Sequence, residues 1–289
     1  MSESGETILR ANGVDLCVET FGSDEDAAIL LIMGSNASMD WWEEGFCRRL
    51  ADGERFVIRY DHRDTGRSVT YQPGMAPYGA GDFVGDAIGL LDTLELASAH
   101  LVGMSMGGAI AQLAALDHPD RVSSLTLIST SPAGPGPEDP DLPPMSAEAI
   151  ARFPAERPDW ADRAAAIEHV VQLARASAGS RPFDEATVRE VSTRAYDRTT
   201  DFASTMANHD AVIGDVGRWR ERLAGLAVPT LVVHGEDDPV LPHNHGVALA
   251  REIPGAELLT LERTGHELPA AAWDVVVPAI LAHTEERRS

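Results

Sequence analysis

Residues 101–110 place the motif Gly-x-Ser-x-Gly between an apolar segment and a segment with few helix breakers. The apolar residues before Ser105 predict a short buried strand, and Ala109 to Leu116 predicts a helix. A sharp strand–turn–helix connection of this kind lifts a serine hydroxyl out of the sheet edge in a strained conformation. Gly103 and Gly107 give the two backbones room to pass closely. The following helix directs its free N–H groups at the reaction centre. We therefore expect Ser105 to be a nucleophile.

A serine hydroxyl needs a base within hydrogen-bond reach, and that base needs a carboxylate to orient it. Downstream, the apolar segment Thr230–Val233 precedes an acidic pair, and Glu257–Leu261 precedes His266. In open α/β sheets, functional groups gather beyond the carboxyl ends of the strands. The order along the chain is then Ser105, an acid at position 237 or 238, and His266. This order differs from the orders found in chymotrypsin and subtilisin.

Short apolar segments alternate with helical patterns over most of the chain, which predicts a mostly parallel sheet with right-handed crossovers. The expected strands are Val14–Phe21 (antiparallel), Ala28–Met33, Phe56–Tyr60, His100–Met104, Ser124–Ile128, Thr230–Val233 and Glu257–Leu261. The expected helices lie near 40–52, 81–97, 107–118, 243–253 and 268–284. After Thr130 the alternation stops at a turn-rich linker, and 146–208 predicts helices without strands.

With these features the chain resembles the α/β-hydrolase fold superfamily. Two further matching segments are 28–36 (Ala-Ile-Leu-Leu-Ile-Met-Gly-Ser-Asn) and 59–68 (Arg-Tyr-Asp-His-Arg-Asp-Thr-Gly-Arg-Ser). Together with the serine motif they most resemble the aclacinomycin methylesterases and related polyketide esterases. The resemblance implies an α/β-hydrolase fold with a mostly parallel eight-stranded sheet and helices on both faces. It also implies a core domain, 1–130 and 218–289, and an inserted helical cap, 131–217.

The resemblance also assigns residues to the site. The family spacing Gly-x-x-Asp, counted from Gly235, selects Asp238 rather than its neighbour Asp237 as the triad acid. One oxyanion-hole donor is the backbone N–H of Met106, directly after the nucleophile. By resemblance, the second donor is the N–H of Ser35. No metal and no cofactor are expected.

Several apolar side chains are expected in loops bordering the nucleophile, and the resemblance favours a large, flat, aromatic acyl group there. Methionine fits irregular apolar space and aromatic faces well. The alternative is that several of these side chains are ordinary core. The loop side chains in question are Met33, Met39, Trp41, Trp42, Met104 and Met106. The expected substrate-binding residues are Gly34, Asn36, Trp41 and Met104.

The charged residues of the chain limit the kinds of molecule that it is expected to bind. The 23 basic residues are all arginine, against 46 acidic residues, for a net charge of −23. The absence of lysine excludes Schiff-base chemistry and a phosphate-loop lysine. The acidic balance disfavours nucleic acid and anionic membranes, and no apolar run is long enough to span a bilayer. Cys17 and Cys47 are expected to be buried thiols. We expect a cytoplasmic protein, monomer or homodimer, with a small-molecule ester as its partner.

These features predict a serine hydrolase that cleaves a carboxylic ester through a Ser-His-Asp triad and an acyl-enzyme. A methyl ester of a polyketide or of another bulky aromatic acid is the expected substrate class. Two alternatives stay open. The same triad would also serve a cofactor-free perhydrolase or haloperoxidase, a C–C hydrolase, a lyase or a polyketide cyclase. A non-catalytic ligand-binding protein on this fold is the other.

Overall fold

The computed structural model describes residues 5–134, 139–212 and 217–285, and its strands form one eight-stranded sheet in the order β1-β2-β4-β3-β5-β6-β7-β8. The pairs β1–β2 and β2–β4 are antiparallel, and all other pairs are parallel. The expected mostly parallel, eight-stranded sheet is therefore confirmed. The strands are β1 (Thr7–Ala11), β2 (Val14–Phe21), β3 (Ala27–Ile32), β4 (Arg55–Tyr60), β5 (Ala99–Met104), β6 (Val122–Ile128), β7 (Thr230–Gly235) and β8 (Glu257–Leu261).

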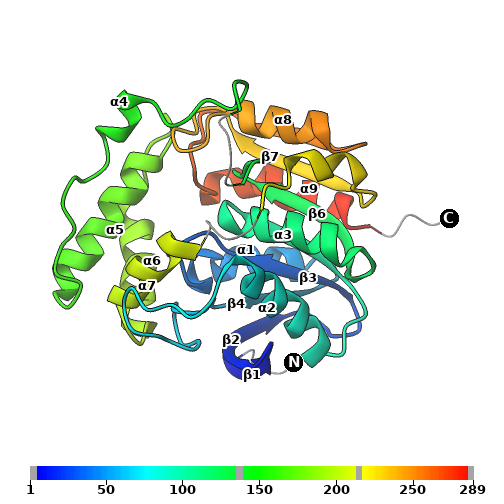
Figure 1. Cartoon of the computed structure of the whole chain (residues 1–289), viewed down its shortest axis with the longest axis horizontal. Coiled ribbons are helices and arrows are strands. Elements are labelled where there is room, and N and C mark those ends of the chain that lie inside the picture. Colours follow the sequence, from blue (N-terminus) through cyan, green and yellow to red (C-terminus); the bar gives the residue numbers. More distant parts are fainter. Residues whose placement is uncertain (1–4, 135–138, 213–216, 286–289) are drawn as a thin grey trace.

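Helices cover both faces of this sheet (Figure 1). On one face, Phe83, Ile110 and Leu249 share an apolar cluster with Leu30 of β3, whereas the next strand residue, Leu31, belongs to the cluster on the other face. This alternation follows from the period of two along a strand. The helices involved are α1 (Glu44–Ala51), α2 (Ala80–Thr93), α3 (Met106–Asp117), α8 (Asn244–Glu252) and α9 (Trp273–His283), with short 3-10 helices η1 (Met39–Trp41), η2 (Pro119–Arg121), η4 (Arg220–Gly225) and η5 (Ala270–Ala272). Within the described ranges, no helix has the length and apolarity needed to cross a bilayer.

Between β6 and β7 the described residues form helices and no strand, and Figure 1 shows these helices grouped on one side of the sheet. Asp162 and Asp184 begin two of them, because each carboxylate accepts backbone N–H groups of the first turn. The helices are α4 (Ala147–Ile150), α5 (Arg163–Ser177), α6 (Glu185–Arg198) and α7 (Phe202–Val212). We call these four helices and the connections between them the cap. Of the expected cap range, residues 135–138 and 213–216 lie outside the described residues.

Six parallel strands end at the same edge of the sheet, which brings their following loops together. In the register of the sheet, Ile32 of β3 lies opposite Gly103 of β5, and Ile128 of β6 lies opposite Val233 of β7. The loops after these strands therefore leave the sheet at nearly the same level. Strand β1 was not predicted, because only its last residue, Ala11, is buried and its sequence shows little apolar alternation.

Both cysteines are buried free thiols, as expected. Burial raises the pKa of Cys17 and of Cys47 to about 12, so neither thiol is a nucleophile near neutral pH.

Candidate active site

Ser105 occupies the turn between β5 and α3 in a left-handed conformation, with φ of 54° and ψ of −117°. Such a conformation is strained for a residue with a side chain. The turn closes only because glycines flank it. A Cβ atom on Gly103 would lie 2.2 Å from the carbonyl oxygen of Gly107, and one on Gly107 would lie 2.0 Å from that of Ile32. The predicted strand–turn–helix arrangement around Ser105 is present.

The Ser105 hydroxyl oxygen lies 2.9 Å from Nε2 of His266, and Nδ1 of the same ring lies 2.8 Å from Oδ2 of Asp238. The other carboxylate oxygen of Asp238 accepts the backbone N–H groups of Val240 and Leu241, each at 2.9 Å. These two amides fix the carboxylate so that its free oxygen faces the imidazole. The three side chains thus form one hydrogen-bonded chain from hydroxyl to base to acid.

Asp237 points elsewhere. Its Oδ2 accepts the backbone N–H of Ser180, at 3.0 Å, in the connection between α5 and α6. The structure therefore brings Asp238, and not Asp237, to His266, and gives Asp237 a contact with the cap. The sequence offered no signal for this second contact, because Ser180 belongs to a distant segment of the chain.

His234 at the end of β7 supports the loop that carries the acid. Its ring is buried and lies 2.8 Å from the carbonyl oxygen of Leu241 and 3.6 Å from Asp238. Burial lowers the pKa of His234 to about 4, so the ring is neutral near neutral pH and Nε2–H donates to Leu241. The imidazole therefore helps to hold Leu241, whose own N–H bonds the Asp238 carboxylate.

The candidate oxyanion donors lie on both sides of Ser105. Met106 begins α3 directly after Ser105, where first-turn amides lack partners within the helix. On the other side, Gly34 lies against Ser105. A Cβ atom on Gly34 would be 3.3 Å from the Ser105 Cβ and 3.9 Å from its hydroxyl oxygen. The loop after β3, which carries the expected donor Ser35, therefore passes beside Ser105.

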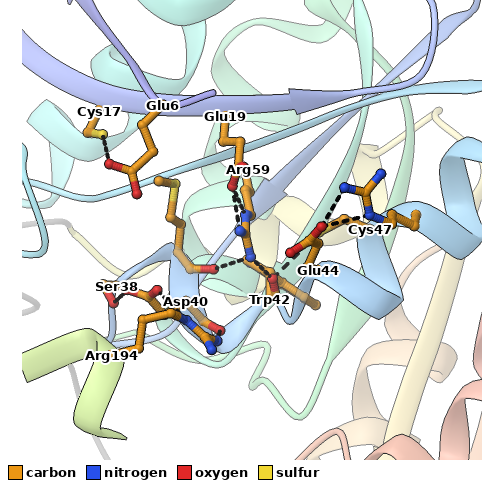
Figure 2. A network of polar contacts seen from close by, with 12 residues as sticks. Glu6, Cys17, Glu19, Ser38, Asp40, Trp42, Glu44, Cys47, Arg59 and Arg194 are labelled. Carbon is orange, nitrogen blue, oxygen red and sulfur yellow. Dashed lines mark hydrogen bonds and ion pairs between the residues drawn. The ribbon is translucent and has the colours of Figure 1, made fainter. Parts of the chain in front are cut away.

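That loop, residues 34–42, is attached to the cap through Asp40. The buried Asp40 carboxylate accepts hydrogen bonds from the Ser38 hydroxyl, at 2.7 Å, and from Nε of Arg194 on α6, at 2.9 Å (Figure 2). Arg198, one turn further along α6, also donates to Asp40. Two arginines of one cap helix thus pair with one carboxylate of this loop.

The same loop is attached to the sheet through Arg59 of β4. The Arg59 guanidinium donates to the carbonyl oxygen of Trp42 and, at 2.8 Å, to the Glu19 carboxylate (Figure 2). Because the Arg59 and Glu19 side chains are only 8% and 13% exposed, water weakens this ion pair little. The far end of the loop is consequently fixed to β2 and β4.

The histidine loop also contacts the cap. The backbone N–H of His266 donates to the carbonyl oxygen of Ser177 at 2.8 Å, and the N–H of Gly179 donates to the Glu267 carboxylate at 3.2 Å. A Cβ atom on Gly265 would lie 2.2 Å from the Ser177 oxygen. The two backbones are close enough here that only glycine fits.

The structure divides the apolar residues expected around the nucleophile into two groups. Trp41 and Met104 are partly exposed, so their role in substrate binding stays a prediction. The others are buried core residues, as the alternative interpretation held, namely Met33, Met39, Trp42 and Met106.

The two histidines of the segment 243–245 hydrogen-bond to neighbouring protein groups. Nε2 of His243 lies 2.9 Å from the Thr260 hydroxyl, and the His245 ring lies 3.0 Å from both the Ser131 hydroxyl and the Pro143 carbonyl oxygen. Across the residues that the structure describes, no three histidine, cysteine or acidic side chains group as metal ligands would.

Comparisons with known proteins agree with this fold. A sequence profile for a family described as alpha/beta hydrolase fold matches residues 27–269, which span β3 to just beyond His266. Rhodomycin D methylesterase DauP of Streptomyces sp. (strain C5) is 35% identical over 295 residues, covering 96% of this chain and 97% of that protein. Rhodomycin D methylesterase DnrP of Streptomyces peucetius is 34% identical over 289 residues, covering 94% and 95%. The crystal structure of a hydrolase from Pseudomonas aeruginosa PA01 matches with a TM-score of 0.73 and 25% identity, covering 98% and 99%.

Proposed function

Because the chain belongs to the alpha/beta hydrolase fold family, we propose that it is a serine esterase acting through Ser105, His266 and Asp238. The observation that carries this proposal is the hydrogen-bonded chain of 2.9 Å and 2.8 Å that joins the three side chains beyond the ends of β5, β7 and β8. The strained backbone of Ser105 supports it further, because strain of this kind persists where the surrounding structure enforces it.

In the acylation step, Nε2 of His266 accepts the Ser105 proton while the hydroxyl oxygen attacks the ester carbonyl carbon. Asp238 orients the ring and stabilises the imidazolium without taking its proton. The backbone N–H groups of Met106 and Ser35 bind the oxyanion of the tetrahedral intermediate. Each such donor contributes roughly 10²–10³-fold to kcat. The C–O bond to the alcohol then breaks, and His266 gives its proton to the leaving oxygen.

In the deacylation step, His266 takes a proton from water as the water oxygen attacks the acyl carbon. The bond to Ser105 breaks, and the serine oxygen recovers its proton from His266. The products are a carboxylic acid and an alcohol, which is methanol for a methyl ester. Every proton in this cycle moves between groups of the chain, the substrate and water, so no cofactor is needed.

We propose the methyl ester of a bulky, largely aromatic polyketide acid as the substrate class. Two relatives that align over nearly their full length are named rhodomycin D methylesterases. Met104, directly before Ser105, and Trp41, in the loop 34–42, are partly exposed apolar residues that could contact such an acyl group. Residues 131–217 would act as the cap over this substrate, and a cytoplasmic location stays a prediction.

The test is a Ser105→Ala variant assayed on a panel of methyl, aryl and polyketide esters. The wild-type protein should release an acid and an alcohol and should react covalently with a fluorophosphonate at Ser105. The variant should keep the fold and lose both properties, and undiminished turnover would refute the proposal. Product analysis separates the alternatives, because perhydrolysis, C–C cleavage and cyclisation give other products.

A further inference from the structure

His209 of α7 is fully buried, and both of its ring nitrogens contact backbone groups of the core. Nδ1 accepts the backbone N–H of Asn36 at 3.0 Å, and Nε2 lies 2.7 Å from the carbonyl oxygen of Arg63. An amide can only donate and a carbonyl can only accept, so Nδ1 carries no proton and Nε2 carries one. The bonding therefore selects the neutral Nε2–H tautomer of His209.

A second buried imidazole, that of His62, lies at the start of the loop 34–42. Nε2 of His62 is 2.9 Å from the carbonyl oxygen of Met33. Burial lowers the pKa of His62 to about 3, so this ring is also neutral and donates to that oxygen. The two rings meet edge to face, with centroids 6.1 Å apart.

These two hydrogen bonds enclose one peptide group. The Met33 carbonyl belongs to the peptide before Gly34, and the Asn36 N–H belongs to the peptide after Ser35. The peptide between them carries the Ser35 N–H. Asn36 has a φ of 59°, in the left-handed region, so the chain turns sharply directly after this donor. The peptide group that carries the Ser35 N–H therefore lies between two peptide groups, each of which is hydrogen-bonded to a buried histidine.

We propose that His209 is a positioning residue for the oxyanion hole, through which α7 of the cap sets the orientation of the Ser35 amide. This inference rests on the proposed function, in which that amide binds the oxyanion. A donor stabilises a transition state most when it is already aimed before charge develops, because no reorganisation is then needed. Releasing Asn36 would let the Ser35 peptide rotate away from that orientation.

Helix α7 is itself held on the core by other hydrogen bonds, so its position can determine the position of the loop 34–42. The side-chain amide of Asn208 donates to the Asp64 carboxylate at 2.8 Å, and the Ser204 hydroxyl donates to the Tyr71 carbonyl oxygen at 2.5 Å. The imidazole of His209 also packs edge to face on Phe83, with centroids 5.4 Å apart. The position of α7 on the core and the geometry of the loop 34–42 are thus coupled through the His209 side chain.

Three substitutions at His209 separate hydrogen bonding from packing. His209→Asn can place an oxygen near the Nδ1 position, His209→Gln keeps a polar group near Nε2 only, and His209→Phe keeps a ring with neither bond. We expect kcat to fall about 10–100-fold for the Gln and Phe variants, with KM within about threefold, because the oxyanion hole acts in the transition state. His209→Asn should recover most of kcat.

The matched control is His169→Asn. His169 is another buried cap histidine, but it packs on Trp160 within the cap, so this variant should leave kcat unchanged.

Wild-type kcat in folded His209→Phe and His209→Gln would overturn the inference. An equal loss in all three variants would also overturn it, because such a loss would come from packing alone.

A second measurement uses the wild-type protein and needs no variant. Nitrogen-15 NMR of the His209 ring should report the Nε2–H tautomer, both free and with a boronic acid bound to Ser105, and the Nδ1–H tautomer would overturn the inference. A wild-type protein that cleaves no ester and ignores fluorophosphonate would refute the proposed function, whereas an active wild type with unaffected variants would refute this inference alone.

Discussion

The backbone N–H of His266 donates to the carbonyl oxygen of Ser177 at 2.8 Å, so the residue proposed as the general base is bonded directly to the cap. Next to it, Gly179 donates to Glu267, and Ser180 donates to Asp237. Each triad residue in the acid and histidine loops thus has a neighbour in sequence whose carboxylate holds a cap amide. The cap is therefore part of the framework that positions the site.

Gly265→Ala should disturb both the cap and the triad. Its Cβ would lie 2.2 Å from the Ser177 oxygen and 2.4 Å from the Gly179 nitrogen, and both are backbone atoms that cannot rotate away. We expect a loss of about 1–3 kcal/mol in the free energy of unfolding, together with a reduced kcat. Urea unfolding and steady-state kinetics would measure these effects.

The control is Gly81→Ala in α2, where an added Cβ meets nothing within 4 Å. It should be neutral or stabilising by up to about 1 kcal/mol, because alanine is a better helix former. Equal stability of the two variants would show that the close approach of Gly265 to the cap is not tight.

The two adjacent aspartates should differ sharply in their effect on activity. Asp238→Asn removes the acceptor that holds the Nδ1–H tautomer of His266, and kcat should fall roughly 10³–10⁴-fold. Asp237→Asn keeps an oxygen that can accept the Ser180 N–H, so kcat should change less than about threefold. Comparable losses in kcat/KM for the two variants would contradict the assignment of Asp238.

Acid should destabilise the fold through its buried neutral histidines. Burial lowers the pKa of His62 to about 3 and that of His234 to about 4, from an ordinary value of 6.5. Below pH 6.5 the unfolded chain therefore binds protons that the folded chain does not. Their stabilising contribution is present above that pH and is lost as pH falls toward 4 and then 3. The loss between pH 7 and pH 5 should be about 2 kcal/mol for each histidine.

Urea unfolding at several pH values would measure this slope, and His234→Gln supplies the comparison. Because the substituted side chain does not titrate, the difference in slope between the two proteins isolates the contribution of His234. Identical pH dependence in both would mean that this ring takes up its proton equally well in the folded chain.

The two arginines of α6 that pair with Asp40 should differ in their contribution to stability. Arg198 is 9% exposed and also pairs with the fully buried Asp61, whose pKa is raised by burial although Arg198 opposes the shift. Arg198→Met leaves two buried carboxylates without this partner and should cost about 3–5 kcal/mol. Arg194 is 40% exposed, and Arg194→Met should cost less than about 1 kcal/mol. Thermal or urea unfolding of the pair would decide, and the reverse ranking would contradict the burial argument.

The sequence by itself determined the frame of the site. Gly-x-Ser-x-Gly between an apolar strand and a helix determined the turn at Ser105, because only glycines permit the close approaches at 103 and 107. Apolar segments of strand length located β2 to β8, and the position of His266 just after the last of them brought it to the same edge of the sheet. These features are local, and parallel pairing alone assembles their ends. The exposed edge strand β1 lacked such a pattern.

Only the tertiary structure decided which groups, distant in the sequence, hold the site residues in position. Asn36 and its partner His209 are 173 positions apart, and nothing in the composition of α7 distinguishes His209 from an ordinary core histidine. Packing likewise decided that Met39 and Trp42 are core whereas Trp41 and Met104 stay partly exposed. The physical reason is that a backbone N–H donates to whichever acceptor the packed elements bring within about 3 Å, and that proximity follows from how the cap lies on the sheet rather than from local propensity.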